Sequence, residues 1–317
     1  MAPPPSVSPS PPSARTSLDD LRKRAGRRIK EEVVRYVLLG SALVSVLVSV
    51  GIVGVLLAEA LPFFTEVSVG DFLTGTRWTP LLEPRSFGVL PLIGGTLLVC
   101  VIAAMLAIPV GSLAAMYLSE YASPRVRRRL KPVLEILAGV PTVVYGTFAL
   151  GVVTPAIQAL MPDARVFNAL SAGIVVGIMI LPMVASLSDD ALRAVPRSLR
   201  DAGYGVGATK REITTGVVYP AAFSGIVSSY LLAISRAIGE TMIVAMAAGS
   251  TPRLTLNPLE SIQTMTGYIV QVSLGDTPAG SVEFRSIFAV GLSLFLMTLV
   301  MNVLSQRIMT RFRESYS

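Results

Sequence analysis

Six long runs of apolar residues, separated by shorter charged segments, dominate the pattern of the chain. Each run approaches or exceeds the roughly 20 residues that a helix needs to cross a bilayer. The runs lie at 36–60, 87–118, 133–160, 169–187, 220–248 and 286–304. Several are longer than the hydrocarbon requires, so we expect those helices to tilt, kink or protrude. The pattern predicts an all-α polytopic membrane bundle of six transmembrane helices.

The distribution of charge gives this bundle a direction. Of the 317 residues only 15% are charged, against about 25% in soluble domains. Four segments, 1–35, 119–132, 188–219 and 305–317, hold 21 of the 27 Lys and Arg residues, and the loops between them hold five, leaving Arg236 inside a run. Cytoplasmic loops of membrane proteins carry such an excess. We therefore expect both termini in the cytoplasm, and we interpret the net charge of +7 as a topology signal rather than as nucleic-acid binding.

The ends of the chain differ from the predicted permease-like body at 36–310. Residues 1–17 are rich in Pro and Ser and are predicted to form a disordered tail. Residues 18–35 are predicted to be a basic cytoplasmic juxtamembrane segment, which could form an amphipathic helix on the inner membrane face. The first apolar run is too long for a signal-peptide core, so we expect it to be retained. Residues 311–317 are expected to be a cytoplasmic tail.

Residue types that commonly carry catalysis or hold metals are scarce. The chain has no histidine, and its single cysteine, Cys100, lies within the second apolar run, where a small buried hydrophobe is the default interpretation. The sequence contains no G-x-x-x-x-G-K-[ST] phosphate loop, since the glycines of 205–210 have the wrong spacing. We expect no enzymatic activity, metal or cofactor in this chain. Energy for transport would have to come from a partner or an ion gradient.

The longest predicted cytoplasmic segment between runs, 188–220, contains two short helical patterns separated near Gly207. Apolar residues recur in it at spacings of three and four, at Leu192, Val195, Leu199 and Ala202. This spacing is typical of a small amphipathic helix, here parallel to the membrane face. From the pattern alone, a solvated or interfacial loop remains an equal alternative.

The same segment resembles the cytoplasmic coupling loop of ABC-importer permeases, whose pattern is E-A-A-x-x-x-G-x9-I-x-L-P. The corresponding positions are Asp201, Ala202, Gly203, Gly207, Val217, Tyr219 and Pro220. The spacing matches throughout, and four positions carry mild departures, among them Asp for Glu and Gly for the second Ala. The resemblance implies that this loop contacts an ATPase subunit. The shorter carboxylate arm of Asp201 would shift or remove one such contact.

A second resemblance is more specific. Residues 236–242, RAIGETM, are similar to the R-A-[IL]-G-E-T-M stretch of the phosphate ABC importer, which pairs two membrane subunits, PstC and PstA. The stretches FLTGTRWTP at 72–80 and LSEY at 118–121 resemble PstC rather than PstA. The resemblance covers roughly 36–310 and identifies the chain as a member of the permease family of binding-protein-dependent transport systems.

This resemblance implies a type I ABC-importer permease fold in a bacterial plasma membrane. It further implies a second, PstA-like permease subunit, two PstB-like ATPase subunits and a PstS-like periplasmic or lipoprotein phosphate-binding protein as partners. The expected substrate is inorganic phosphate. The binding protein is expected to deliver it to the outer loops, mainly 61–86 and 249–285.

Arg236 and Glu240 stand one helical turn apart inside the fifth run, so they are predicted to share a face and to pair. A charge at that depth costs roughly 2.5–3.5 kcal/mol and usually marks a substrate path. The planar fork of an arginine suits phosphate oxygens, and Glu240 would orient Arg236 or accept a phosphate proton. The alternative is a pair that only stabilises helix packing. Because no other basic residue is expected at this depth, a second subunit should supply another cation.

Two other functions remain open at this stage. One is a permease of another ABC importer, for sulfate, molybdate or an organic solute. The other is a stand-alone secondary anion carrier that uses Glu240 as a proton site, although the sequence offers no convincing internal repeat in its favour. Copurification of an ATPase subunit would separate a permease from a carrier.

Overall fold

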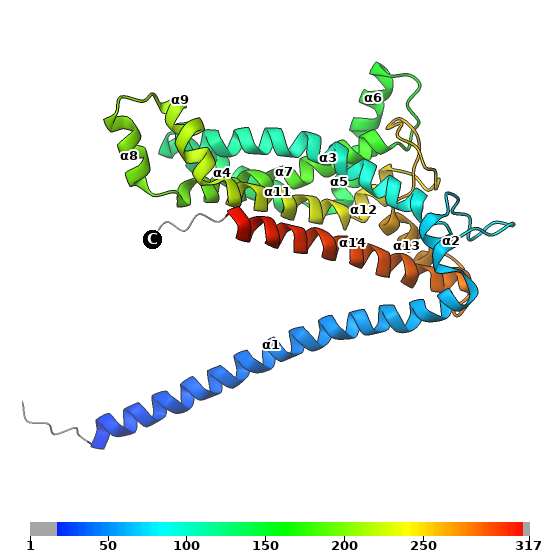
Figure 1. Cartoon of the computed structure of the whole chain (residues 1–317), viewed down its shortest axis with the longest axis horizontal. Helices are drawn as coiled ribbons and strands as arrows, with labels where there is room; N and C mark the ends of the chain where they lie inside the picture. The colour runs from blue at the N-terminus through cyan, green and yellow to red at the C-terminus, as the bar shows by residue number, and fades with distance from the viewer. Residues whose placement is uncertain (1–17, 313–317) are drawn as a thin grey trace, which may run out of the picture. The chain divides into compact units, whose positions relative to one another are not determined.

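The computed structural model describes the backbone of residues 18–312 and the side chains of residues 31–308. Within that range the chain is helical apart from its loops and one isolated antiparallel bridge between Trp78 and Phe87 (Figure 1). The all-α prediction is therefore confirmed. The predicted tail at 1–17 and nearly all of the predicted tail at 311–317 lie outside the described residues.

The helices and the three π-helical turns (η) follow one another along the chain. They are α1 (Leu18–Glu66), α2 (Val69–Thr74), α3 (Leu90–Met116), η1 (Tyr117–Tyr121), α4 (Pro124–Gly139), α5 (Thr142–Phe148), η2 (Ala149–Val153), α6 (Thr154–Leu160), α7 (Ala169–Ala194), α8 (Arg197–Gly205), α9 (Lys210–Ile213), η3 (Thr214–Val218), α10 (Tyr219–Ala221), α11 (Phe223–Ile238), α12 (Met242–Ala247), α13 (Met265–Leu274) and α14 (Val282–Phe312). Two of the π turns directly precede a proline in the next helix, Pro155 and Pro220. A proline has no N–H to donate, which favours such an adjustment of the helical hydrogen bonds.

Six membrane spans fit the described helices. Five segments are long and apolar enough by themselves: Glu31–Glu66, Leu90–Tyr121, Thr142–Leu160, Ala169–Ala194 and Val282–Ile308. The sixth is a broken span, Lys210–Ala221 followed by Phe223–Ile238, with a bend of 68° at the break. The prediction of six apolar spans is thus met when the bent pair counts as one.

Two predicted spans are interrupted in the structure. The run at 133–160 is divided between α4 and α5, because Pro141 stands between them in an extended conformation and cannot continue the hydrogen bonds of α4. The run at 220–248 is divided at Ala222 and again at 239–241. Apolar composition predicted the presence of these runs but not their breaks.

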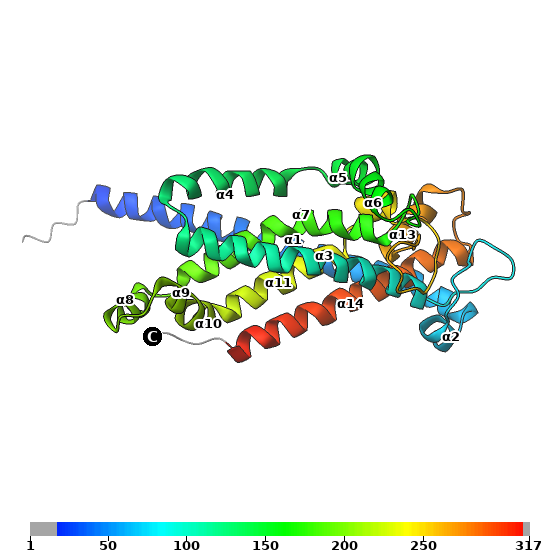
Figure 2. The ribbon, with the colours of Figure 1, turned by 90° about the horizontal axis from the view of Figure 1, so that it is seen from above.

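The chain divides into two compact units, one ending at Val55 and the other beginning at Leu56. In the first unit, helix α1 carries exposed apolar side chains from Val33 onward. In the second unit, α3 and α7 pack along each other, and α11 packs on both of them and on α14 (Figure 2). The coupling end, formed by α8 and α9, lies opposite the loop end, which contains α2, α6 and α13 (Figures 1 and 2).

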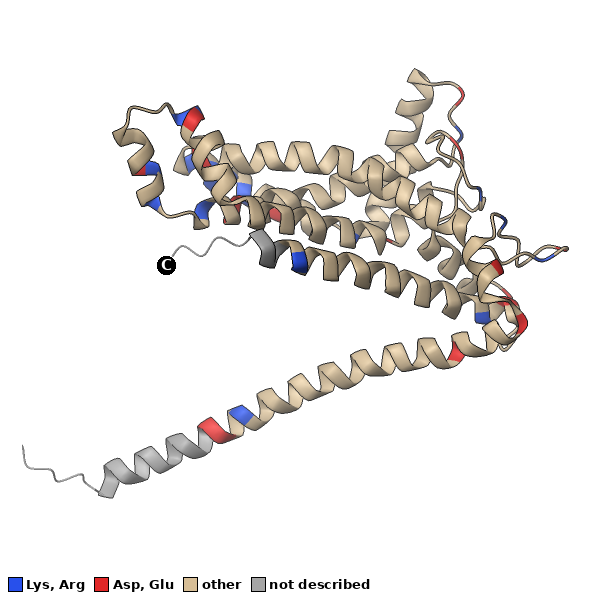
Figure 3. Cartoon of the chain, in the orientation of Figure 1, with Lys and Arg blue, Asp and Glu red and all other residues tan. Residues whose placement is uncertain are grey.

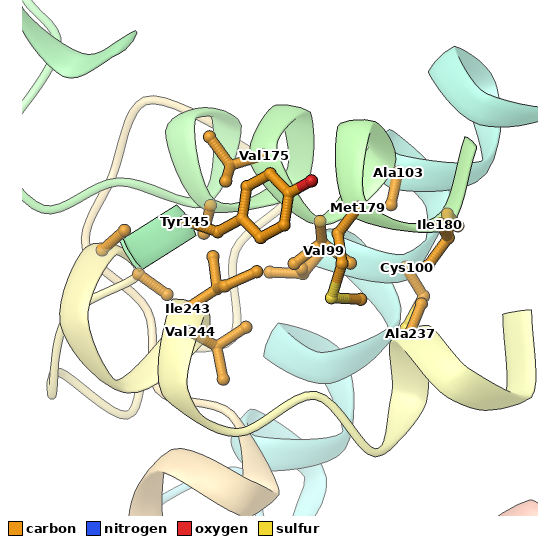
Figure 4. Close-up of a cluster of buried hydrophobic side chains, with 14 of the residues drawn as sticks. Val99, Cys100, Ala103, Tyr145, Val175, Met179, Ile180, Ala237, Ile243 and Val244 are labelled. Carbon is orange, nitrogen blue, oxygen red and sulfur yellow. The ribbon is translucent and has the colours of Figure 1, made fainter. Parts of the chain in front are cut away.

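Small residues bring α3 and α7 into close contact. A Cβ added to Gly173 would lie 2.6 Å from Cβ of Ile102, and one added to Gly111 would lie 2.7 Å from Cγ1 of Val184. Such close approach is typical of membrane helices, where dispersion contacts replace the hydrophobic effect as the main driving force. The resulting core extends to α5 and α12, whose Tyr145 and Ile243 point into it (Figure 4).

The loop end is fixed by aromatic packing. Trp78, from the stretch at 72–80, is 1% exposed and makes edge-to-face contacts with Phe72 and Tyr268. The hydroxyl of Tyr268 is 2.6 Å from Oγ of Ser286. Burial raises the pKa of Tyr268 to about 12 and keeps this hydroxyl protonated. The aromatic stretch therefore supports the loops of this end rather than presenting a free surface.

Candidate functional site

The fifth run is interrupted where its two charged residues stand. Helix α11 ends at Ile238, Gly239 caps it, and α12 begins at Met242. The carboxylate of Glu240 accepts hydrogen bonds from the backbone nitrogens of Met242 (3.1 Å) and Ile243 (3.2 Å). Glycine weakens a helix, and a side chain that binds nearby backbone groups competes with helical hydrogen bonds. The residues of the motif thus create the break and satisfy the N–H groups that it frees.

This geometry corrects the predicted pairing of Arg236 with Glu240. Among the described side chains, no ion pair joins the two, since Glu240 is turned toward α12 and is only 7% exposed. The i, i+4 rule requires a continuous helix between the two residues. Here the helix ends at Ile238, so the rule does not apply. The two residues instead lie on either side of a break.

Arg236 stands in the last turn of α11, and its side chain is exposed. Its guanidinium lies 3.9 Å from the sulfur of Met179, a weak contact. Leu232, one turn earlier on the same face, is 44% exposed. The C-terminal end of a helix favours a cation, because the helix dipole is negative there. Near the end of the broken span, the chain therefore presents an arginine whose hydrogen-bonding capacity is largely unused among the described residues.

The break is held from the loop end as well. The hydroxyl of Thr266, in α13, donates to the carbonyl of Glu240 at 2.7 Å. On the other side, a Cβ added to Gly146 of α5 would lie 2.6 Å from the sulfur of Met246, so α5 and α12 are in close contact. In Figure 4, Ile243 and Val244 of α12 face the buried cluster that includes Tyr145. The break is therefore a defined, packed structure.

The coupling segment begins later than its apolar pattern predicted. Helix α7 continues to Ala194, and α8 begins at Arg197 after Pro196 interrupts the chain. Leu192 and Val195 therefore precede the helix that contains Leu199, and the predicted single amphipathic helix is wrong. A proline disfavours helical conformation in the residue before it, which explains the interruption. The apolar residues nevertheless join one cluster with Ile213 and Val218.

The turn between the two short helices is confirmed at Gly207. Its φ of +82° is rarely adopted by residues with a side chain. Helix α9 then begins with a capping box, in which the backbone nitrogen of Thr209 donates to Glu212 at 2.7 Å and Thr209 accepts from the nitrogen of Glu212 at 3.4 Å. The sequence motif thus fixes both the reversal of the chain and the start of the next helix.

The remaining coupling residues occupy different environments. Asp201 and Ala202 are exposed on α8, and Pro220 is exposed in α10. Gly203 is half-buried, and a Cβ there would lie 2.9 Å from Cγ1 of Ile213. The close packing of α8 on α9 accounts for glycine at this position, where the family pattern has alanine.

A buried ion pair, not anticipated from the sequence, fixes α8 to the rest of the bundle. Arg200 donates to both carboxylate oxygens of Glu120, at 2.8 and 3.4 Å, and to the carbonyls of Val195 (2.7 Å) and Leu192 (2.8 Å). The side chains of Arg200 and Glu120 are 17% and 9% exposed. One guanidinium thereby joins α8 to the ends of α7 and η1. The only signal in the sequence was the presence of both charges in predicted cytoplasmic segments.

Two further ion pairs at this end join α4 to α7. Arg127 pairs with Asp189, whose side chain is 2% exposed, and Nζ of Lys131 lies 3.4 Å from Oδ1 of Asp190. Figure 3 shows that the charges of the described residues gather mainly at the ends of the bundle. Among those residues, no group of three or more acidic or cysteine side chains is placed to hold a metal ion.

Solved structures share this arrangement of helices. A chain in the crystal structure of a bacterial alginate ABC transporter is similar over 91% of this chain and 98% of its own, with a TM-score of 0.62 and 15% identity. A chain of the MetNI methionine ABC transporter is similar over 72% of this chain and 95% of its own, with a TM-score of 0.54 and 17% identity. At such identities the likeness establishes the fold, which is that of ABC-importer permeases.

Other proteins have a higher sequence identity to this chain than these two structures have. The chain is 33% identical over 293 residues to the probable ABC transporter permease protein YqgH of Bacillus subtilis, covering 92% of this chain and 94% of that protein. It is 31% identical over 260 residues to the phosphate transport system permease protein PstC of Mesorhizobium japonicum, covering 76% and 78%. A family model matches residues 107–315. The chain therefore belongs to the family of binding-protein-dependent transport system inner membrane components.

Proposed function

We propose that this chain is a transmembrane permease subunit of an ATP-driven importer of inorganic phosphate. The observation that carries the proposal is the exposed guanidinium of Arg236, placed by the broken helix at the depth of a membrane span. Relatives named as phosphate transport permeases support the choice of solute. Broken helices line substrate sites in many transporters, because their ends offer unpaired polar groups inside the membrane.

Arg236 is the residue proposed to contact phosphate. Its planar donors match the spacing of phosphate oxygens, and its weak contact with Met179 leaves them available. Glu240 is proposed as a positioning residue of the same pathway. By capping α12 it fixes where α11 ends, and with it the place of Arg236.

The exposure of Arg236 also supports a second, PstA-like permease subunit. A charge facing lipid is costly, whereas one facing a cavity between two subunits is stabilised by water and by its ligand. One arginine does not neutralise a phosphate that carries between one and two negative charges. The partner is therefore expected to contribute at least one more cation to the pathway.

The coupling end is proposed to bind the ATPase. Asp201 and Ala202 are exposed there, and the neighbouring Tyr204 and Val206 are 50% and 85% exposed, which suits a docking surface. Two PstB-like ATPase subunits would supply the energy. A PstS-like phosphate-binding protein would deliver the solute to the loop end.

This assignment places the coupling end in the cytoplasm and the loop end outside, in a bacterial plasma membrane, with both termini cytoplasmic. Single cysteines introduced at the exposed residues Thr76 and Gly205 in a Cys100→Ala background test the orientation. The first is expected to react with an impermeant thiol reagent from outside in intact cells, and the second only after permeabilisation. Reversed labelling would overturn the orientation.

The function itself is tested by uptake into proteoliposomes. The chain is reconstituted with its PstA-like and PstB-like partners and the binding protein, and labelled phosphate is measured with and without ATP. Phosphate uptake that requires ATP and every partner is expected. Uptake by this chain alone would favour a secondary carrier, and ATP-dependent uptake of sulfate or molybdate in preference to phosphate would identify another importer.

A further inference from the structure

An exposed asparagine stands inside the last membrane span, on a different helix from the charged motif at 236–242. Asn302 belongs to α14 and lies within the span Val282–Ile308, six residues before the end of that span. Its neighbours along the chain, Met301 and Val303, are apolar. An amide that faces hydrocarbon leaves its hydrogen bonds unmade, which is unfavourable. Polar side chains at such positions therefore usually face a bundle interior or a water-filled cavity, where they mark a substrate path.

One end of this amide is held by the helix that carries Arg236. The hydroxyl of Ser235, in α11, donates to Oδ1 of Asn302 at 3.3 Å. Among the residues whose side chains are described, none accepts a hydrogen bond from the amide nitrogen of Asn302. That nitrogen carries two N–H donors. The contact with Ser235 thus fixes the carbonyl end of the amide and leaves both donors available.

The arrangement of the helices places these donors on the same open face as the guanidinium. Helix α11 packs between α7 and α14, which make little contact with each other within the described residues (Figures 1 and 2). Successive helical residues are rotated by about 100°, so Ser235 faces α14 while Arg236, beside Met179, lies at the edge of α7. Leu232 falls between these two directions one turn earlier and is 44% exposed. A strip of α11 therefore remains uncovered, with Arg236 on one border and Asn302 on the other.

We propose that Asn302 is a second phosphate contact of this chain, which donates from Nδ2 to an oxygen of a phosphate held by Arg236, and that Ser235 positions its amide. This inference rests on the proposed function and deepens it. A neutral amide adds donors without adding charge, which suits a solute that must be released after it has bound. Because Ser235 engages the amide oxygen, the side chain offers its donors to the anion.

Asn302→Asp separates a phosphate contact from a simple link between helices. The aspartate keeps an oxygen that can accept from Ser235, whereas both N–H donors are replaced by a negative charge. Phosphate uptake is measured in proteoliposomes with saturating, phosphate-loaded binding protein and is normalised to assembled complex. Uptake should fall about tenfold in Asn302→Ala, the effect of losing one hydrogen bond to a charged group. It should fall about 30-fold in Asn302→Asp, because the carboxylate also repels the anion.

The positioning role of Ser235 is tested by rescue. Ser235→Ala removes the hydroxyl that fixes the amide, and uptake should fall about threefold, because the donors remain but are no longer oriented. Ser235→Thr keeps a hydroxyl and should return uptake to within about twofold of the wild-type value. The matched control is Gln306→Ala, which removes an exposed amide one turn further along α14. Uptake in the control should also stay within about twofold of the wild-type value.

A failure of this contact differs from a failure of the proposed function. Absence of phosphate uptake by the wild-type complex would remove the proposed function itself. Phosphate uptake by the wild type that is unchanged in Asn302→Ala would remove only the asparagine from the pathway. Uptake that is retained in Asn302→Asp but lost in Asn302→Ala would reduce Asn302 to a link between α11 and α14. Loss of assembled complex in both variants would place Asn302 against the second permease subunit and overturn the phosphate contact.

Discussion

Two arginine–glutamate combinations in this chain behave in opposite ways. Arg236 and Glu240 stand four residues apart and do not pair, whereas Arg200 and Glu120 stand 80 positions apart and form a buried, two-point contact. In the first case the helix ends between the residues. In the second, packing of α3, α7 and α8 brings them together. Separation in the sequence is therefore a poor guide to pairing where helices break.

The difference extends to what each arginine can do. All three donor nitrogens of Arg200 bind inside the protein. Two of them donate to backbone carbonyls, that of Leu192 in α7 and that of Val195 between α7 and α8. Arg200 therefore acts as a structural brace. Arg236 has one weak contact and remains exposed. A guanidinium with unused donors at membrane depth is available to a ligand. Three of the four predictions below test this contrast between a buried, fully bound arginine and an exposed one, and the other tests the packing of α8 on α9.

The largest effect is expected at the open arginine. Arg236→Gln should lower phosphate uptake on the order of 100-fold, because hydrogen bonds to a charged group contribute up to about 3 kcal/mol. The amount of assembled complex should stay near the wild-type value, because the side chain makes no ion pair within the described structure. Uptake normalised to assembled complex is the measurement. Wild-type uptake in this variant would remove Arg236 from the pathway.

A smaller effect is expected at the braced arginine. Arg200→Gln should lower uptake about tenfold while ATP hydrolysis falls less, so more ATP is consumed per phosphate moved. Removing one partner of a buried ion pair costs about 3 kcal/mol or more, which loosens α8 from α7 and η1. The ratio of hydrolysis to uptake in proteoliposomes is the measurement.

Arg197→Gln provides the matched control, because Arg197 is an exposed arginine of the same helix. It should leave the ratio unchanged. The ratio of hydrolysis to uptake in Arg200→Lys should fall between those of Arg197→Gln and Arg200→Gln, since an ammonium keeps the charge but cannot reach Glu120 and two carbonyls together. A ratio that is normal in Arg200→Gln would mean that the brace does not transmit movement.

A third, milder effect is expected where α8 meets α9. Gly203→Ala places a Cβ 2.9 Å from Ile213 and should lower the melting temperature of the complex by a few degrees, since overpacking costs about 1–3 kcal/mol. Gly205→Ala is its control, because no atom lies within 4 Å of the added Cβ. That variant should be neutral or slightly stabilising, since alanine favours a helix. Equal melting temperatures would contradict the close packing.

Much of the fold could be predicted from the sequence, and the reasons are physical. Apolar runs reflect contact with lipid or core along the whole length of a span, so composition locates them. The turn at Gly207 was predictable because few residues other than glycine adopt its φ of +82°. The capping residues Thr209 and Glu212 likewise act within one helical turn. Features governed by neighbouring residues were the ones that the pattern revealed.

The site was predicted in its residues but not in its geometry. The break at Gly239 depends on Glu240 binding the start of α12 and on Thr266, 26 positions away. The contact of Arg200 with Glu120 depends on the packing of separate helices. No local pattern encodes such distances. The residue types therefore indicated where charge lies in the span, whereas the structure showed which charged side chain is exposed and makes no ion pair.

The smallest effect is expected at Glu240. Glu240→Gln keeps a carbonyl oxygen that can accept from Met242 and Ile243, so the cap of α12 should survive with a loss of about 1 kcal/mol. Uptake should fall by less than about fivefold. Glu240→Ala removes the oxygen that accepts both hydrogen bonds and should lower uptake further, because the end of α11, and with it Arg236, is no longer fixed. Higher uptake in Glu240→Gln than in Glu240→Ala would identify a positioning role for Glu240. Complete loss of uptake in Glu240→Gln, with normal assembly, would show instead that the carboxylate itself acts on phosphate, and the distinction between the two residues of the break would then no longer hold.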